Sequence, residues 1–418
     1  MLKEFRPVVK NSKFLYLWIS QIFSQITINL TNFVLLIKLF STTGSSIATS
    51  LLWVSYALPA IVVGPFGAAI VDMVDRRSVL IITNLLQSLV IFLYALNYTK
   101  GIFLLYGATV GYAFLNQFYV PAEAASLPSL VEKKHLPFAN SLFFMTQQGS
   151  IIVGFLTAGI LNHLLGFATT LFVASFFLFL AFVSVSLLPK IQPSEELPVR
   201  FEEGIVNFFE RIFQGYKFIK ENRHVLVPFL FLLGFQITMA TILINTPLIV
   251  VDIFRFNLNS GIIFIVISAV LGAVTGSLLI SKLLRRGFRK KLVIENSLLL
   301  LSLSLLFFTF LVPELGIIMK TLIGGGAIFL AGFSAIGIVI PSQTFLQENT
   351  PGGLRGRVFG NFWFLATIAT VFPVLFSGAV SELFGVRLLL FVFVTLTFSA
   401  FFFSRNYGDK FLTNKESV

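Results

Sequence analysis

The sequence predicts an all-α membrane protein, with twelve transmembrane helices in two pseudo-symmetric six-helix bundles. Apolar segments long enough to cross a bilayer follow one another along the 418 residues, basic residues gather in alternate gaps, and the two halves echo each other. A chain in lipid must satisfy its backbone polar groups internally, and long helices do this. The composition, 56% hydrophobic and 11% charged, leaves too little polar surface for a water-soluble fold.

The predicted spans have similar lengths and contain few charges. They are 14–40, 47–71, 78–97, 102–126, 138–162, 166–188, 224–251, 260–283, 292–312, 318–346, 357–381 and 385–404. The first span is too long for the apolar region of a signal peptide, so we expect no cleavable signal. The chain has no Cys, which excludes disulfides and thiolate metal sites.

The distribution of basic residues predicts the orientation in the membrane. Of the 30 Lys and Arg residues, only five lie at or near one set of gaps: Lys38, Lys100, Arg255, Lys320 and Arg387. Cytoplasmic loops carry the excess of basic residues in membrane proteins. We therefore expect both termini in the cytoplasm. The same bias accounts for the net charge of +12, so we expect no nucleic-acid partner.

One long polar interruption divides the spans six and six. Residues 1–188 form the predicted N-terminal bundle, 189–223 a cytoplasmic linker, and 224–418 the C-terminal bundle. Within the linker, apolar residues from Phe201 to Ile219 recur at helical spacing among charged ones. This pattern is typical of an amphipathic helix on a membrane surface.

The two halves share short patterns at equivalent places. Segment 65–77, after the second span, and segment 272–286, after the eighth, each place glycine before a cluster of basic residues. Pro121 of the fourth span has its counterpart in Pro341 of the tenth. Such internal symmetry is typical of transporters built from repeats, which bind substrate near the bilayer midplane between the repeats.

Four segments carry a resemblance to a known family. They are the loop 68–77, in which Ala68 replaces a family glycine, the run 121–142 across the fourth and fifth spans, and the stretches 215–223 and 351–358. With these motifs the chain resembles the major facilitator superfamily, and within it the branch of bacterial macrolide-efflux proteins and the enterobactin exporter.

The resemblance implies a secondary active transporter of the bacterial inner (cytoplasmic) membrane that works by alternating access. On this basis we expect export of an amphipathic small molecule, such as a drug-like compound or a siderophore, by a monomer in contact with membrane lipids. Three alternatives stay open: nutrient uptake, lysolipid translocation, and a membrane sensor or scaffold without transport activity.

Uncharged amides within the spans are the candidate substrate-binding residues. Gln21, Gln25, Asn29 and Asn32 lie on one face of the first span at spacings of four, four and three. Unpaired amides in hydrocarbon cost several kcal/mol, so these should line a cavity or, alternatively, hydrogen-bond a neighbouring helix. The other candidates are Asn116, Gln117, Gln147, Gln148, Gln236 and Asn245.

Glu123 is the candidate residue for proton coupling, because acidic residues are scarce at membrane depth and burial makes a carboxylate easier to protonate. Alternatively it is an interfacial glutamate beside Lys133 and Lys134. Relatives in the branch often carry an acid in the first span. Here the corresponding stretch 24–28 has none, which disfavours ordinary proton antiport.

Charged residues near the inner ends of spans are the candidate gate. By resemblance, Asp72 contacts the start of the eleventh span, where a helix N-terminus favours negative charge. Arg76, Arg77, Arg355 and Arg357 are the expected members of the same cluster. The alternative is that these bases only set the topology.

The sequence offers no catalytic or cofactor site. The three histidines, His135, His163 and His224, are dispersed at span ends, and no Cys or carboxylate cluster accompanies them. We therefore expect no enzymatic activity, no cofactor and no metal site.

Overall fold

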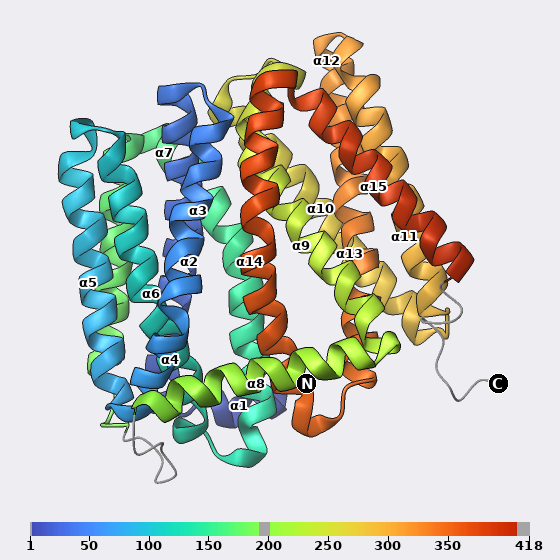
Figure 1. Cartoon of the computed structure of the whole chain (residues 1–418). Coiled ribbons are helices and arrows are strands. Elements are labelled where there is room, and N and C mark those ends of the chain that lie inside the picture. The colour runs from blue at the N-terminus through green and yellow to red at the C-terminus, as the bar shows by residue number, and fades with distance from the viewer. Residues whose placement is uncertain (1, 192–200, 408–418) are drawn as a thin grey trace. The chain divides into compact units, whose positions relative to one another are not determined.

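The computed structural model describes residues 2–191 and 201–407, and every secondary-structure element within those ranges is a helix (Figure 1). The chain divides into two compact units. Unit 1 contains Met1–Thr42 and Val54–Phe209, and unit 2 contains Thr43–Trp53 and Glu210–Val418. Two helices, α3 (Ser46–Val62) and α8 (Phe201–Glu221), divide between the units, and Thr43, the last residue of α2, also falls in unit 2.

Each remaining helix belongs to one unit, and α2 is counted with unit 1, which contains all of it but the last residue. Those of unit 1 are α1 (Leu2–Val9), α2 (Ser12–Thr43), α4 (Gly64–Met73), α5 (Arg76–Asn97), η1 (Tyr98–Lys100), α6 (Ile102–Leu130), η2 (Lys133–His135) and α7 (Leu136–Ser186). Those of unit 2 are α9 (Arg223–Ile249), η3 (Val250–Phe254), α10 (Leu258–Arg285), α11 (Lys290–Phe310), η4 (Val312–Glu314), α12 (Ile317–Met319), η5 (Lys320–Gly324), α13 (Gly325–Glu348), α14 (Gly352–Phe384) and α15 (Val386–Tyr407).

Nine helical segments of the described chain are long and apolar enough to cross a membrane, or ten if the bent pair α3 and α4 counts as one span. The predicted span 138–162 and all but the last two residues of 166–188 fall within α7, which has 51 residues. The predicted span 102–126 corresponds to α6, which is not among the nine.

Backbone geometry explains the break within α7. Gly166 has φ 79° and ψ 170°, which is not helical, and it separates two helical stretches. A positive φ is disfavoured for residues with a Cβ, so glycine allows the chain to change direction here. The α7 segment is therefore two helices joined at Gly166.

The core of unit 1 forms where α2, α5, α6 and α7 meet. Phe14 and Leu17 of α2 are fully buried, and they belong to the same apolar cluster as Leu80 of α5, Tyr119 of α6 and Val185 of α7. Aromatic contacts extend the cluster, since the rings of Phe14 and Phe143 lie 5.9 Å apart. This core fixes the α2, α5 and α6 side chains that form the polar site described below.

In unit 2, α10 and α13 approach closely because glycines line their contact. A Cβ on Gly276 would lie 2.9 Å from the carbonyl oxygen of Phe333, and one on Gly272 would meet the backbone of Phe329. Gly332 of α13 faces the backbone of Ala269 in the same way. Small residues allow such backbone approach between helices in membranes.

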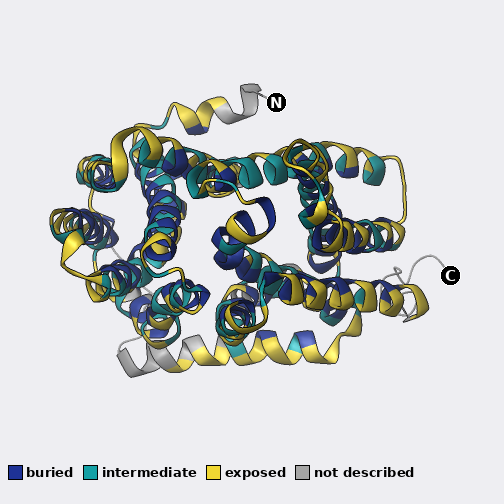
Figure 2. Ribbon diagram, turned by 90° about the horizontal axis from the view of Figure 1, so that it is seen from above, coloured by how far each residue is buried: buried dark blue, intermediate teal, exposed yellow. Residues whose placement is uncertain are grey.

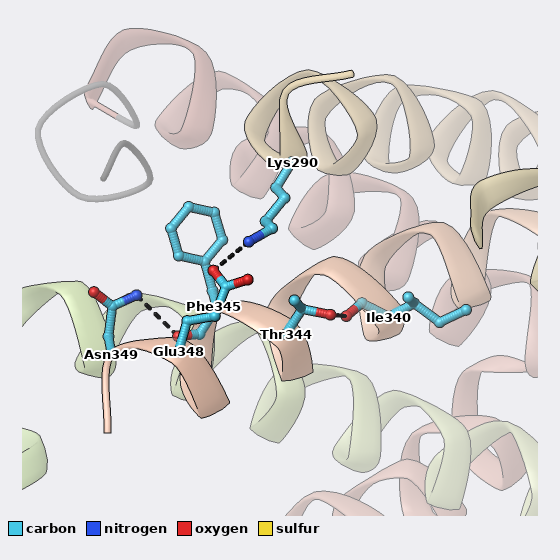
Figure 3. A network of polar contacts seen from close by, with 6 residues as sticks. All are labelled: Lys290, Ile340, Thr344, Phe345, Glu348 and Asn349. Carbon is cyan, nitrogen blue, oxygen red and sulfur yellow. Dashed lines mark hydrogen bonds and ion pairs between the residues drawn. The ribbon is translucent and has the colours of Figure 1, made fainter. Parts of the chain in front are cut away.

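A polar contact ties α11 to α13 at the end of unit 2 where α13 finishes. Lys290, the first residue of α11, pairs with Glu348 at the end of α13 and lies over the ring of Phe345, 5.0 Å from its centroid (Figure 3). Below this pair, Asn349 donates to the Phe345 carbonyl at 2.9 Å, which extends the helix end. The contact is partly exposed and holds the ends of two neighbouring helices together.

Much of the exposed surface is apolar. Figure 2 shows exposed residues along the outer sides of many helices, and among them are Phe103, Phe372 and Leu383, which are 91%, 74% and 74% exposed. In water, such continuous apolar surface would be unfavourable. It is typical of helices whose outer sides contact lipid.

Candidate functional site

Glu123 of α6 lies inside unit 1, with only 6% of its surface exposed. One turn earlier on the same helix, the Tyr119 hydroxyl donates a hydrogen bond of 2.7 Å to Glu123 Oε1. The spacing of four residues places both side chains on one helical face. Glu123 is therefore a buried carboxyl rather than an exposed one at the helix end.

Tyr119 connects Glu123 to a group of small polar side chains. Its hydroxyl lies near Ser20 and Ser24 on α2. Ser24 Oγ donates to Asn84 Oδ1 at 3.0 Å, and Asn84 Nδ2 donates to Ser20 Oγ at 3.2 Å. We call these five residues the buried polar cluster. It joins α2, α5 and α6, and none of its members is more than 6% exposed.

The cluster contains one acid and no base. Among the residues that the structure describes, Glu123 takes part in no ion pair. An ionised carboxylate buried without a cation is costly, whereas the protonated acid is not. The cluster can therefore hold a proton on Glu123, with the Tyr119 hydroxyl and the serine hydroxyls as its hydrogen-bonding surroundings.

Some amide side chains of α2 hydrogen-bond to α7, and one does not. Gln21 is 4% exposed; its Nε2 donates to the Phe143 carbonyl of α7 at 3.3 Å, and its Oε1 has no partner. Asn29 donates to Ser150 of α7 at 3.4 Å. Gln25, between them, is half-buried, and its side chain makes no hydrogen bond to the described part of the chain. Two of the amides thus tie α2 to α7, while Gln25 stays available to a ligand.

A small cavity lies further along α2 within unit 1. Its volume is about 10 Å³, about enough for one water molecule. Its lining residues are Thr31, Asn32, Leu35, Tyr56, Ile91, Thr109 and Tyr112. Thr31 Oγ1 is buried without a hydrogen-bond partner. Hydroxyl and amide groups therefore converge on a space that accepts a single small polar group.

The remaining amides of unit 1 do not converge on one point. Asn116 donates to the Tyr56 hydroxyl at 3.4 Å, next to the small cavity, and Gln117 donates to its own helix at the Ala113 carbonyl. Gln147 and Gln148 of α7 are exposed. Asn32 and Asn116 are therefore the two candidates that approach the same space.

In unit 2, Asn245 of α9 is fully buried. Its Nδ2 donates to the Thr241 carbonyl and to Ser377 Oγ of α14, both at 2.9 Å, whereas its Oδ1 has no partner. Gln236, earlier on α9, is half-buried. Asn245 thus connects two helices and keeps an unused acceptor.

The expected gate is described only in part. Arg76 is 8% exposed and donates to the Ala125 carbonyl of α6 at 3.0 Å, and Arg77 donates to the Ser186 carbonyl of α7 at 2.8 Å. The side chains of Asp72, Arg355 and Arg357 lie outside those that the structure describes. The two described arginines brace the start of α5 against the ends of its neighbours.

Asp75 is a structural residue that sequence reasoning did not single out. It caps the N-terminus of α5, accepting from Ser78 Oγ at 2.7 Å, and it accepts from the Ile191 backbone N–H at 2.9 Å. Partial burial raises the pKa of the Asp75 carboxyl. The hydrogen bonds from Ser78 and Ile191 lower this pKa by more than burial raises it, so the pKa lies below its ordinary value. The run Asp-Arg-Arg-Ser was the available signal, since Asp is a preferred N-cap.

Tyr119 and Asn84 were also missed. Tyr119 precedes Glu123 by one helical turn, which is a signal that the sequence does contain. Asn84 is an amide within the apolar third span, and it could have been selected by the criterion applied to the first span.

Comparisons with known proteins agree with one another. The family model of the Major Facilitator Superfamily matches residues 17–374. An uncharacterized MFS-type transporter, YfiS of Bacillus subtilis (strain 168), is 26% identical over 384 residues, which cover 86% of this chain and 84% of that protein.

Solved structures show the same fold at low sequence identity. The nucleoside transporter NupG matches with a TM-score of 0.72 and 14% identity, over 94% of this chain and 98% of that one. A bacterial homolog of the human lysosomal transporter Spinster, in an inward-facing and unoccupied conformation, matches with a TM-score of 0.70 and 12% identity, over 97% and 99%.

Proposed function

The chain belongs to the major facilitator superfamily, and we propose that this multi-pass membrane transporter exports an amphipathic small molecule from the cytoplasm by alternating access. The branch of macrolide-efflux proteins and the enterobactin exporter is the proposed affiliation, supported by the motifs at 121–142 and 351–358.

We further propose twelve crossings in two bundles of six. In this arrangement α7 crosses twice, on either side of Gly166, and α6 crosses once despite its lower hydropathy. Both termini and the linker 189–223 then face the cytoplasm at the bacterial inner membrane, in keeping with the basic-residue bias. We propose that the protein functions as a monomer.

The buried pair of Glu123 and Tyr119 is the observation that carries the coupling proposal. An ionisable residue at membrane depth without a counter-charge is a candidate for a proton site. The 2.7 Å hydrogen bond from Tyr119 holds Glu123 Oε1 in place, and no cation of the described residues pairs with Glu123. We propose that Glu123 takes up and releases the coupling proton as the two bundles alternate.

Uptake of an uncharged polar nutrient is the second candidate function. Only the chemistry of the small cavity favours it: Thr31, Asn32 and Tyr112 supply neutral donors and acceptors and no charge, whereas the volume of about 10 Å³ holds one water molecule and no substrate. Such a lining favours hydroxyl groups, as in nucleosides or sugars, over large apolar bodies. NupG, a nucleoside transporter, shares the fold, and at 14% identity the fold is all that is shared.

Transport in vesicles of both orientations tests the proposal. Inside-out vesicles containing the protein would be screened with radiolabelled amphipathic compounds and with nucleosides, with and without a pH gradient, against vesicles without the protein. Export predicts accumulation of an amphipathic compound in inside-out vesicles only when the gradient is present. Accumulation of nucleosides in right-side-out vesicles instead would replace export with uptake.

A further inference from the structure

Gln87 of α5 is fully buried, and neither end of its amide has a partner within the described part of the chain. Its exposed fraction is 0%, and both Nε2 and Oε1 lack a hydrogen bond there. Buried polar groups are in the great majority hydrogen-bonded, either to protein or to ordered water. Because an amide carries both donors and acceptors, a ligand that satisfies Gln87 must be able to accept as well as donate.

Gln87 lies between the buried polar cluster and the small cavity. On α5, Asn84 of the cluster precedes it by three residues, and Ile91 of the cavity wall follows it by four. These spacings put the three residues on one face of the helix. The face that presents Gln87 therefore carries the cluster at one end and the cavity at the other.

Helices α2 and α6 join the same two features over the same length. On α2, Ser24 of the cluster and Thr31 of the cavity wall are seven positions apart. On α6, Tyr119 of the cluster and Tyr112 of the cavity wall are also seven positions apart. Seven residues make two helical turns, which is about 10 Å of helix length. The three helices meet at both ends of this length, and we call the line along which they face one another, from Tyr119 to Tyr112, the polar seam.

The cavity end of the polar seam has the same need as Gln87. Thr31 is 4% exposed, and its Oγ1 has no hydrogen-bond partner among the residues that the structure describes. The cavity beside it has room for about one water molecule, and hydroxyl and amide groups without charge line it. A buried water makes about three hydrogen bonds and can both donate and accept. Water is therefore the ligand whose chemistry fits both Thr31 and Gln87.

We propose that a file of buried water molecules follows the polar seam from the small cavity to the buried polar cluster, and that it carries the coupling proton to Glu123. Gln87 holds the file midway, through the amide donors and acceptors that no described residue uses. Hydrogen-bonded waters lie about 2.8 Å apart, so about three of them bridge the seam.

Delivery of the proton rests on the proposed function of Glu123, whereas the file itself does not. Each water takes a proton from one neighbour and passes another to the next, so one O–H bond forms for each that breaks. At the cluster, the Tyr119 hydroxyl gives its proton across the 2.7 Å hydrogen bond to Glu123 Oε1 and takes one from the nearest water. A proton that enters at the cavity thereby neutralises the carboxylate, and release runs the same steps in reverse.

Hydroxyl-radical footprinting of the purified transporter tests the file without reference to transport. A brief X-ray pulse converts water, bound water included, into radicals, and mass spectrometry measures how fast each side chain is oxidised. Tyr112 and Tyr119 are 5% and 1% exposed, so rapid oxidation of their rings reports a buried water beside them. Phe33 of α2, 2% exposed and stacked on Phe155, is the apolar comparison.

Gln87→Leu removes the amide at similar volume and should lower the oxidation of Tyr112 at least about threefold, because the file loses its contacts midway. The matched control is Thr170→Val, which should leave it unchanged, since the buried Thr170 hydroxyl donates to the Gly166 carbonyl of its own helix. Size exclusion confirms folding, and Thr31→Val replaces Gln87→Leu if the latter does not fold. Oxidation of Tyr112 no faster than that of Phe33, or unchanged in the folded variant, would overturn the file.

Proton-driven transport in proteoliposomes tests the delivery. Gln87→Leu should slow accumulation at least about tenfold, because proton transfer needs hydrogen-bond contact at each step. Exchange of labelled for unlabelled substrate moves no net proton and should stay near the wild-type rate. Loss of the footprint with wild-type accumulation would overturn the delivery. Wild-type accumulation by Glu123→Gln would instead overturn the proposed role of Glu123 and delivery to it, while the footprint decides the file by itself.

Discussion

Replacing Gly276 with alanine tests the close approach of α10 and α13. The new Cβ would lie 2.9 Å from the Phe333 carbonyl oxygen, 3.2 Å from the Phe333 Cα and 3.3 Å from the Ile336 Cβ. The first two atoms belong to backbone and cannot rotate away, so the helices must separate by several tenths of an ångström. Overpacking of this kind costs about 1–3 kcal/mol, and the better helix propensity of alanine returns about 0.5–1 kcal/mol.

The net loss of about 1–2 kcal/mol should lower the thermal midpoint by roughly 1–4 °C, since the shift falls with the length of the chain that unfolds. The measurement is intrinsic tryptophan fluorescence of the purified protein during heating in detergent. The matched control is Gly326→Ala on α13, because a Cβ there meets nothing within 4 Å. This control should melt at or above the wild-type temperature. If Gly276→Ala melts as high as Gly326→Ala, the helices do not approach as described.

Three further perturbations test other parts of the account. Folding lowers the pKa of Asp75, so the ionised carboxylate stabilises the folded protein fully at pH values above the pKa of the unfolded chain, and this stabilisation is lost as pH falls through the pKa of the folded protein. Asp75→Asn should therefore make the melting temperature fall less steeply on acidification. Parallel curves of melting temperature against pH for variant and wild type would contradict this. Lys290→Met and Glu348→Gln should show a coupling of at most about 1 kcal/mol in a double-mutant cycle, since the pair is partly exposed; a larger coupling would mean a buried pair. Gln25→Ala should weaken binding of a compound found by the vesicle screen by about 5–150-fold without lowering the melting temperature; unchanged affinity would remove Gln25 from the site.

Hydropathy predicted most helices but not how they are interrupted. The predicted span 14–40 corresponds to α2, Ser12–Thr43, because a long apolar run leaves little choice of structure. The predicted span 47–71 is interrupted at Val63, between α3 and α4, although its apolar character is continuous. The π-helical turn at Lys320–Gly324 was also not predicted. The interruption at Val63 had a signal in the sequence, because Pro65 lacks a backbone N–H and stands in the first turn of α4. The π-helical turn has no such signal.

The candidate site was predictable where one helix supplies it and not where several do. Glu123 and the amides of the first span stand out because polar residues are scarce in apolar segments. The contact of Ser24 with Asn84 joins residues 60 positions apart, and it exists only because α2 packs on α5. The sequence also left open whether the amides bind substrate or helices. Gln21 and Asn29 contact α7, whereas the Gln25 side chain hydrogen-bonds to none of the described residues.

Proton-coupled transport by the Glu123→Gln variant tests the central claim most directly. A proton crossing the membrane supplies about 2.3 kcal/mol per 100 mV of membrane potential. At about 100 mV, coupling one proton to one substrate therefore supports roughly fifty-fold accumulation of the substrate. Glutamine resembles the protonated acid but cannot release a proton. In proteoliposomes, the account predicts that Glu123→Gln exchanges labelled for unlabelled substrate at nearly the wild-type rate and accumulates none against its gradient. Accumulation equal to that of the wild type would contradict the assignment of Glu123 as the proton site.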